Sequence, residues 1–460
     1  MTRVTRVAPM LLRGRISAGH GLIDLIGVAA FTVSSWLLFT VLAGLNVFIR
    51  RQDAPPNAFV TAVGLDPSVS GATLLAWTLI AACASVLLVV PVLTLGAAAA
   101  RIGALGRDQR LSTLRLLGVT GAQVVRLSTL ETMLTALVGA VLGLAVYLVS
   151  LPAWAAIRFQ ATPLSAAEML LPIGAIAGII GLVVVLAGLS SITGLMRLQI
   201  SPLGVARRAP RPAMKVWRFV ALPVLVVAWL VGAPLVIQSQ TLIVSVTVIL
   251  VVLAVFMGVI NLFGPWVLQL LGRILSRSGR PAVLLAGRRL LADPKGTWRS
   301  VSGLAFVGFT GGALTALPDL GSAATDPLSR ILAEDLQTGT YLTLAIAFVV
   351  AAASTLLNQA SAVLDHRQEL HQLGNLGVPE SLHHRTRLVE VVVPAAFASL
   401  GSGGLAVYFF GVLQQSEPSQ FGSLAFLGTL VVGIALVWAA GEACRPLVRS
   451  AVAGTGPRPD

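Results

Sequence analysis

The chain has 460 residues, of which 56% are hydrophobic and only 11% are charged. A soluble domain carries about 25% charged residues, so the composition excludes a soluble globular protein and indicates an integral membrane protein. The net charge of +14 could suit a nucleic-acid partner, but the basic residues recur in short clusters between apolar runs and form no single patch.

The first part of the chain contains four apolar runs long enough to cross a bilayer. A basic lead, residues 1–20, precedes them and is expected to lie along the membrane surface as an amphipathic helix. The four spans are expected at about residues 22–49, 73–99, 125–151 and 169–195. In the third span, the spacing Gly139-x-x-x-Gly143 permits close packing of helices in lipid.

A linker rich in proline and arginine, residues 200–218, divides the chain. Two spans at about 219–237 and 242–271 follow as a hairpin. The basic segment 273–299 then predicts an interfacial elbow helix, with arginines on one face and leucines on another. Four more spans are expected at about 301–317, 341–363, 388–413 and 423–443. An outer loop, residues 318–338, separates the first two of these and carries Asp319, Asp326, Glu334 and Asp335.

The distribution of charge predicts the orientation of these ten spans. If the N-terminus is inside, all but four of the 32 Lys and Arg residues fall in inner segments. The four exceptions are Arg50, Arg51, Arg158 and Arg330. Because basic residues are retained on the cytoplasmic side, both termini are expected in the cytoplasm of a multi-pass protein of the plasma membrane.

Two segments on the inner side of this topology resemble each other: residues 107–119, the first coupling segment, and residues 367–378, the second coupling segment. Their alignment places Leu111 on Leu370, Leu114 on Leu373, Leu117-Gly118 on Leu376-Gly377, and the later Glu131 on Glu390. Copies on the same side of the membrane indicate parallel repeats, whereas inverted repeats would lie on opposite sides.

The predicted fold is therefore an all-α polytopic membrane protein with ten transmembrane helices, arranged as two parallel four-helix repeats and a central two-helix hairpin. Residues 1–199 would hold the first repeat with its amphipathic lead. Residues 200–272 would hold the linker and the central hairpin, and residues 273–460 the elbow helix and the second repeat.

Each coupling segment predicts a short amphipathic helix with a stripe of leucines at three- and four-residue steps. Gly118 and Gly377 would end these helices in a left-handed cap. Such a helix suits docking into a groove of a soluble partner; the alternative is an interfacial helix that only anchors the loop. The residues expected to couple to a partner are Arg110, Leu111, Leu114, Arg115, Leu117, Gly118, Glu369, Leu370, Leu373, Leu376 and Gly377.

The carboxylates Glu131 and Glu390 occupy matching positions near the inner ends of spans three and nine. Pairing with a nearby arginine, such as Arg126 or Arg387, is favoured over a role in transport. An ion-coupled carrier needs ionisable residues at mid-depth in the membrane, and the sequence places none there. Polar residues within spans, among them Asn261, Asn358 and Gln359, are expected to bond neighbouring helices.

No chemistry of its own is expected from the chain. It contains no G-x-x-x-x-G-K-[ST] motif, so it has no P-loop, and neither an enzyme activity nor a cofactor is expected. Cys83 and Cys444 are too few and too distant for a disulfide scaffold. Histidines near the second coupling segment lack the accompanying ligands of a metal site and are expected to be solvated loop residues; they are His366, His371, His383 and His384.

At the coupling segments the sequence resembles the FtsX-like permease family of ABC transporters. The run Leu114-Arg115-Leu116-Leu117-Gly118, with Glu131 a dozen residues later, is similar to the family pattern of Leu-Arg-x-Leu-Gly and a later Glu. The second copy is looser, because Gly374 stands where the family usually has Arg. The elbow sequence from Arg288 to Pro294 is also similar to the family's lead into its first repeat helix.

The resemblance implies a permease subunit driven by a separate ABC ATPase, in two copies, one beneath each coupling segment. Permeases of bacitracin-type peptide resistance have this layout and carry a large outer domain, whereas the loop 318–338 leaves about twenty residues. Export or extraction of a hydrophobic or amphipathic compound from the bilayer, such as an antimicrobial or a lipid, is therefore expected. The alternative is a non-transporting mechanotransmission or sensor subunit that couples ATP hydrolysis to an extracytoplasmic or kinase partner.

Overall fold

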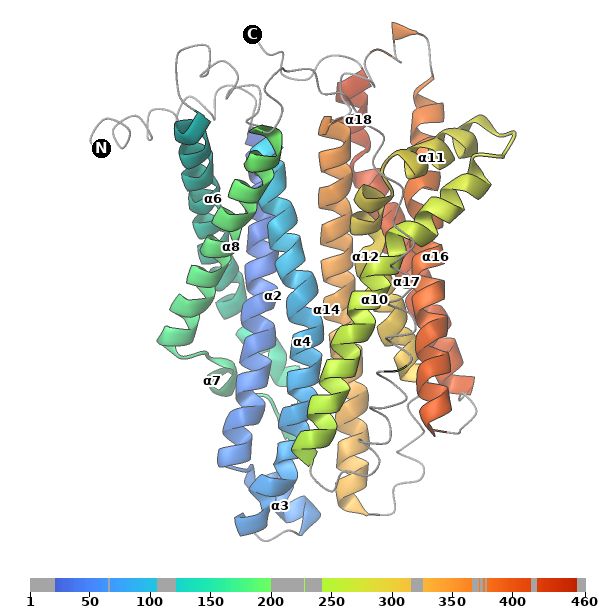
Figure 1. The fold of residues 1–460 in the computed structure, drawn as a ribbon. Helices are drawn as coiled ribbons and strands as arrows, with labels where there is room; N and C mark the ends of the chain where they lie inside the picture. Colours follow the sequence, from blue (N-terminus) through green and yellow to red (C-terminus); the bar gives the residue numbers. More distant parts are fainter. Residues whose placement is uncertain are drawn as a thin grey trace, which may run out of the picture.

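The structure of the chain is a computed structural model that describes residues 21–64, 67–105, 121–199, 242–315, 326–365, 379–414 and 420–452, with a few isolated positions between them. Figure 1 shows these residues as a bundle of long α-helices. The long helices are α2 (Gly21–Asp53), α4 (Pro67–Leu105), α6 (Gly121–Ser150), α8 (Ile173–Gln199), α10 (Leu242–Leu275), α12 (Pro294–Thr315), α14 (Pro327–Asp365), α16 (Glu380–Gln414) and α17 (Gln420–Ala443). The shorter ones are α3 (Asn57–Val63), the 3-10 helix η1 (Leu151–Ala156), α7 (Ala166–Met169), α11 (Pro281–Ala292) and α18 (Arg445–Val452).

Seven helices of the described part are long and apolar enough to cross a membrane: α2, α4, α6, α8, α10, α14 and α16. The prediction of a helical membrane protein agrees with this count and composition. The predicted spans 301–317 and 423–443 coincide with α12 and α17, which are not among the seven. The predicted span 219–237 lies outside the described residues except for Val227.

The helix α12 is less apolar than a lipid-facing span because it lies inside the bundle. Val301, Leu304 and Phe306 are at most 6% exposed. Other helices cover it, so it can retain Gly, Ser and Thr at positions that would otherwise meet lipid.

The expectation of an outer loop over residues 318–338 is wrong for residues 327–338, because these form the first turns of α14. With 39 residues this helix is roughly 59 Å long, about twice the hydrocarbon thickness of a bilayer. Hydropathy identifies only the part of a helix that suits lipid. Because Glu334 and Asp335 lower the hydropathy of the first turns, the sequence did not indicate that these turns are helical. The predicted fourth span begins at Ile173 and not at Met169, because the preceding residues form α7 and a break.

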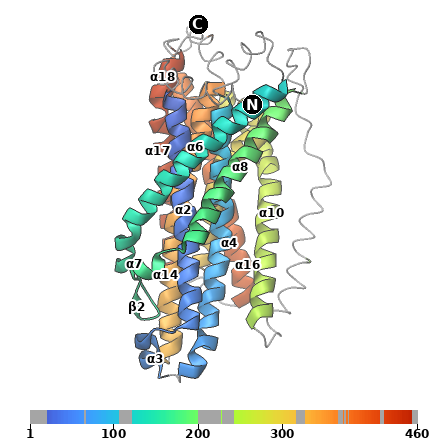
Figure 2. The same ribbon diagram turned by 90° about the vertical axis from the view of Figure 1, so that its left-hand side faces the viewer.

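The first helix group, α2, α4, α6 and α8, is built around α2 (Figures 1 and 2). Helix α2 packs along α4 and α6, and α8 packs against α6 and α4. A Cβ at Gly143 would lie 2.7 Å from the carbonyl oxygen of Thr32 and 2.8 Å from the Cβ of Ser35, and a Cβ at Gly139 would overlap Phe31. The predicted close packing at this glycine pair is confirmed.

The second helix group, α12, α14, α16 and α17, is built around α12. Helix α12 packs along α16, α14 and α17, while α10 and α11 lie alongside and contact α12 and α16. Here the small residues belong to the central helix: a Cβ at Gly308 or Gly312 would overlap the backbone at Ser399 or Gly403 of α16. Both groups therefore contain a close approach of two helices at glycines. In the first group the glycines lie on α6, which packs against the central helix, and in the second they lie on the central helix α12 itself.

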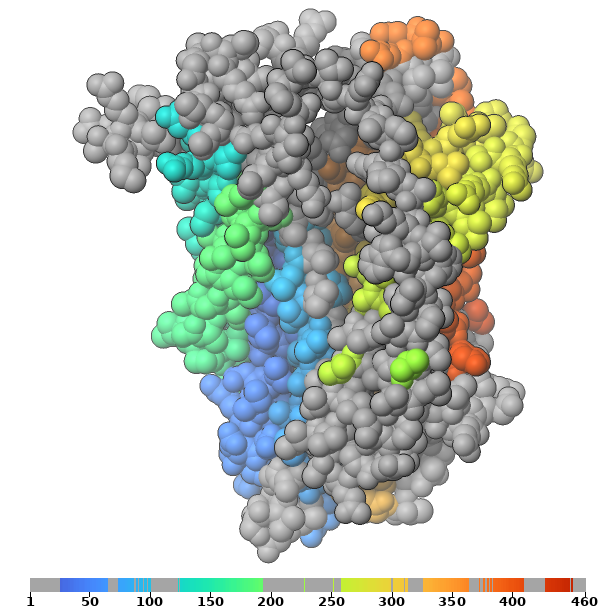
Figure 3. Space-filling model, viewed as in Figure 1, coloured from blue at the N-terminus to red at the C-terminus, as the bar shows by residue number. Residues whose placement is uncertain are grey.

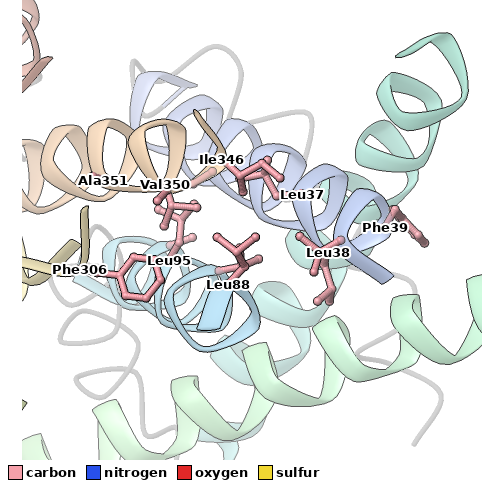
Figure 4. Close-up of a cluster of buried hydrophobic side chains, with 14 of the residues drawn as sticks. Leu37, Leu38, Phe39, Leu88, Leu95, Phe306, Ile346, Val350 and Ala351 are labelled. Carbon is pink, nitrogen blue, oxygen red and sulfur yellow. The ribbon is translucent and has the colours of Figure 1, made fainter. Parts of the chain in front are cut away.

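The two helix groups meet along α4 and α14, with α2 beside them. Figure 4 shows the apolar side chains gathered at this junction, which come from α2, α4, α12 and α14. The buried members include Leu37, Leu38, Leu88, Leu95, Phe306, Ile346, Val350 and Ala351. All of these belong to one continuous cluster, so the groups share a single core.

The helix termini define two ends of the bundle. Helix α4 ends and α6 begins at the top of Figure 1, where α14 also ends and α16 begins. We call this the coupling end, because the two coupling segments fall between these helix pairs in the sequence. The opposite end, where α2 ends and α14 begins, is called the Arg51 end.

A small hairpin lies at the Arg51 end between α6 and α8, visible in Figure 2. Its strands are β1 (Arg158–Phe159) and β2 (Thr162–Pro163), which pair antiparallel. The two turn residues, Gln160 and Ala161, have φ values of 55° and 58°. Two positive φ values define a type I′ turn, which favours Asn and Gly. A left-handed backbone costs other residues about 1–2 kcal/mol each, so contacts elsewhere must hold this turn.

Candidate functional site

Most residues of the predicted coupling set lie outside the described residues: Arg110, Leu111, Leu114, Arg115, Leu117, Gly118, Glu369, Leu370, Leu373 and Gly377. Leu376 is described, and its side chain is 78% exposed. The site is therefore built from the helix ends that flank each segment, α4 and α6 for the first and α14 and α16 for the second.

Gln359 and Arg387 join the two helices that flank the second coupling segment. The Nε of Arg387 donates a hydrogen bond to Oε1 of Gln359 at 2.8 Å. Gln359 is only 6% exposed, so this charge-assisted bond is largely shielded from water. The bond joins α14 to α16 close to the segment.

Glu390 connects α16 to α11, which lies in the segment predicted as the elbow helix. Its Oε2 lies 3.5 Å from Nη1 of Arg289 in α11, and both side chains are about one quarter to one third exposed. The sequence predicted pairing with a nearby arginine such as Arg387, and this ion pair is formed with an arginine of another helix. The repeat-matched Glu131 lies in the third turn of α6, as Glu390 lies in the third turn of α16, and it is partly buried.

His384 and Glu442 connect α16 to α17. The Nε2 of His384 lies 3.0 Å from Oε1 of Glu442, and Nη1 of Arg445 lies 3.8 Å from Oε2 of the same carboxylate. The prediction that His383 and His384 are loop residues is wrong, because α16 already begins at Glu380. Together with the Gln359–Arg387 and Arg289–Glu390 contacts, this pair links four helices at the coupling end.

A second polar cluster, which the sequence did not predict, surrounds Arg51 at the opposite end. The Arg51 side chain is 3% exposed. Its Nε donates to Oε1 of Glu168 at 3.0 Å and its Nη2 to Oε2 at 2.9 Å, a bidentate ion pair. Its Nη1 also donates to the carbonyl of Phe159 at 2.8 Å, and Nη2 to that of Pro163 at 3.2 Å. The last residues of α2 thereby hold both strands of the hairpin.

Glu168 is positioned for this pair by a capping box at the start of α7. The Ser165 hydroxyl accepts from the backbone N–H of Glu168 at 3.2 Å, and the Glu168 carboxylate accepts from the backbone N–H of Ser165 at 3.1 Å. Partial burial alone would raise the pKa of Glu168, but the hydrogen bonds and charge of Arg51, with those of Ser165, outweigh it and hold the pKa below its usual value.

Asp335 links the second helix group to the first at this end. Its Oδ2 accepts from Nε1 of Trp77 in α4 at 2.8 Å and from the backbone N–H of Gln160 in the hairpin turn at 2.8 Å. Asp335 is 7% exposed and Trp77 is 4% exposed. A small apolar cluster, Phe59, Leu74 and Trp77 with Leu328, Ile331 and Leu332, surrounds the pair. We call this contact the Asp335 latch.

The strained turn is explained by the latch. Gln160 presents its N–H to Asp335 in the left-handed conformation described above, and its own side chain is fully buried. Neither amide atom of that side chain has a hydrogen-bond partner within the described part of the chain. A left-handed residue with a buried, unsatisfied amide persists where surrounding contacts impose it, which is typical of functional positions.

The two polar clusters lie at opposite ends of one helix. Asp335 and Gln359 both belong to α14 and are 24 residues apart, which corresponds to roughly 36 Å. Because this exceeds the hydrocarbon thickness of a bilayer, the clusters would sit at opposite membrane surfaces when α14 spans it.

The sequence contained weak signals for the Arg51 cluster. Arg51 is one of four basic residues on the predicted outer side, and the run Ser165-x-x-Glu168 is a capping-box pattern. The pairing itself joins residues 117 positions apart, and no local pattern reveals such a contact. Comparison of the chain with models of known protein families and with the sequences of characterised proteins finds no match.

Proposed function

We propose that the chain is the membrane-spanning permease subunit of an ATP-driven transporter of the FtsX-like type. In this proposal it has ten spans in two parallel repeats, with both termini and both coupling segments in the cytoplasm. A separate ABC ATPase, in two copies, docks on the coupling segments. The substrate is a hydrophobic or amphipathic compound that is exported or extracted from the bilayer.

The observation that carries the proposal is the matched packing of the two helix groups. In each group the first helix packs along the second and the third, and the fourth packs against both of these: α2, α4, α6 and α8 in one, α12, α14, α16 and α17 in the other. In the sequence, each coupling segment follows the second helix of its group. A duplication in one orientation would produce this correspondence, and it supports assigning the same role to both segments.

The contacts at the coupling end supply a route for force. Gln359, Arg387, Glu390 and His384 brace α14, α16, α11 and α17 close to the second coupling segment. An ATPase that draws the two segments together would therefore move these helices as one body. The Asp335 latch and the core in Figure 4 hold the groups together farther along the bundle, so such a movement would be a hinge about the latch.

The short connections at the Arg51 end favour a substrate that arrives through the bilayer. Helices α2 and α4 are joined there by residues 54–66, which include α3, and α6 and α8 by residues 151–172, which form η1, the hairpin and α7. The first connection packs through Phe59 of α3 against Trp77, and Arg51 and Asp335 hold the second through the hairpin and α7. Within their described residues, neither connection forms a separate recognition domain. Transport from the membrane phase is therefore favoured over signalling through such a domain.

The experiment is affinity purification of the chain from its own cells, with quantification of a co-purifying P-loop ATPase. Replacing Leu114 and Leu117 together with Asp places charge in the predicted docking stripe and should abolish co-purification without preventing membrane insertion. The matched control replaces Gln109 and Ser112 with Asp, which adds the same charge at the same spacing on the opposite face of the predicted helix and should retain the ATPase. Unchanged recovery with the leucine variant would refute the docking role.

Substrate-stimulated ATP hydrolysis separates transport from mechanotransmission. The complex is reconstituted in liposomes, and amphipathic peptides or lipids are added. Stimulation with movement of the compound supports a transporter. Hydrolysis that never responds to such compounds, but responds to a protein partner, would support the mechanotransmission alternative and contradict the proposal.

A further inference from the structure

The helix hairpin formed by the end of α10 and by α11 carries an exposed basic surface. Arg273, Arg277, Arg280 and Arg288 are all exposed, and their side chains form no ion pair within the described part of the chain. Between residues 242 and 300 the sequence has one acidic residue, Asp293, whose Oδ1 accepts from the backbone N–H of Gly296 at 3.0 Å. The neighbouring sequence thus supplies almost no compensating negative charge.

Exposed apolar side chains alternate with these arginines. Leu270 and Ile274 are 44% and 61% exposed and lie beside Arg273 on α10, and Leu285, 41% exposed, lies one turn before Arg288 on α11. Arginine side chains at such positions bury their stems along apolar surface and extend their charged heads to the interface. This mixture is typical of a surface at the boundary between acyl chains and headgroups.

The two arms of the hairpin are closely packed, which holds the exposed arginines on one preformed surface. A Cβ at Gly287 would lie 2.5 Å from the backbone nitrogen of Ser276, and a Cβ at Gly272 would lie 3.1 Å from the carbonyl oxygen of Gly287, so α10 and α11 touch backbone to backbone. The backbone N–H of Ser276 bonds to the carbonyl of Gly272 at 2.9 Å. The Arg289–Glu390 ion pair anchors the hairpin to α16.

The position of the hairpin decides what can cover it. Figures 1 and 3 show residues 273–292 projecting sideways beyond α16 near the coupling end. The candidate membrane span of α10 runs from Gly258 to Leu275 and ends at the base of the hairpin. The arginines therefore lie where the chain leaves the hydrocarbon, on a surface that faces laterally. A partner that grips the coupling segments would approach from the end of the bundle, whereas a lateral surface at this depth meets lipid.

We propose that this hairpin surface binds the headgroups of anionic phospholipids in the leaflet at the coupling end. The four exposed arginines complement the phosphate charge, and the exposed leucine and isoleucine side chains enter the acyl layer. The proposal requires only the membrane location and does not depend on the transport function. A basic residue near an anionic membrane surface contributes about fivefold to binding. The three arginines replaced in the test below should therefore contribute on the order of 100-fold together.

The test measures retained phosphatidylglycerol and phosphatidylcholine on the purified protein by native mass spectrometry, together with thermal unfolding at increasing phosphatidylglycerol. The variant replaces Arg273, Arg277 and Arg280 with Gln. The matched control removes the same charge from exposed arginines at the other end of the bundle, with R50Q, R158Q and R330Q. A third protein replaces the first three arginines with Lys, which keeps the charge and tests folding of the altered hairpin.

The wild-type, the control and the Lys variant should retain phosphatidylglycerol in preference to phosphatidylcholine, and the Gln variant should bind it at least tenfold more weakly. Equal binding by the Gln variant, or an equal loss in the R50Q/R158Q/R330Q control, would overturn the proposal. So would a Gln variant that keeps the lipid but loses a co-purifying protein, because the surface would then serve that protein.

Discussion

Replacing Arg51 with Met tests whether the Arg51 cluster holds the hairpin and α2 together. The substitution keeps an unbranched apolar stem, shorter than that of Arg, and removes the charge and four hydrogen bonds, to both carboxylate oxygens of Glu168 and to the carbonyls of Phe159 and Pro163. Breaking a buried ion pair by removing one partner costs about 3–5 kcal/mol. Glu168 is 33% exposed and regains some hydration, so we expect a loss of roughly 2–4 kcal/mol.

The assay is thermal or denaturant unfolding of the purified protein in detergent, followed by tryptophan fluorescence. The control is Arg330→Met, which removes an ion pair to Glu334 whose side chains are 72% and 66% exposed, and which should change the stability by less than about 1 kcal/mol. A double variant with Glu168→Gln should lose less than the sum of the single changes, because it leaves no unpaired buried charge. If Arg51→Met were no more destabilising than Arg330→Met, the assignment of Arg51 as a structural clamp would be refuted.

Two further predictions concern pH and helix contact. The pKa of Glu168 is depressed in the folded protein from a reference value of 4.5. Its ion pair therefore stabilises the fold fully above that pH, and this stabilisation is lost as the pH falls through the folded pKa. The stability advantage of the wild-type over Glu168→Gln should be constant from about pH 7 to about pH 5 and shrink below about pH 4.5. Gly143→Ala should destabilise by about 1–3 kcal/mol, because the new Cβ would lie 2.7 Å from the Thr32 carbonyl oxygen. Gly178→Ala in α8, where a Cβ meets nothing within 4 Å, is the control and should be neutral or stabilising in the same unfolding assay, while equal effects would contradict the close α2–α6 contact.

The sequence predicted those features that depend on local pattern. Apolar runs located the long helices, because a span in lipid must be apolar along its length. The glycine pair in α6 and the inter-helix role of Asn261 and Gln359 also followed from residue type; Nε1 of Trp298 donates to Oδ1 of Asn261 at 2.8 Å and so joins α12 to α10. The Asn358 amide donates to the Ser354 carbonyl of its own helix at 2.8 Å.

Features that depend on distant partners were not predictable. Asp335 in the sequence suggests a loop, because nothing nearby indicates that Trp77 and a strained turn at Gln160 will surround it. That turn also lacks the Asn or Gly that normally marks positive φ. The coupling residues themselves were placed by repetition and resemblance, and Glu390 shows the limit of that approach, since its partner Arg289 is contributed by the elbow and not by the repeat.

The central claim is that both coupling segments lie on one side of the membrane, opposite to the start of α14. Single cysteines at Ser112, Gln372 and Ser329, in a chain whose Cys83 and Cys444 are replaced with Ala, can be labelled with a membrane-impermeant thiol reagent in intact and permeabilised cells. We expect Ser329→Cys to react in intact cells, and Ser112→Cys and Gln372→Cys to react only after permeabilisation. Labelling of Ser112→Cys and Gln372→Cys from opposite sides would contradict the parallel duplication and, with it, the proposed docking of an ATPase on both segments.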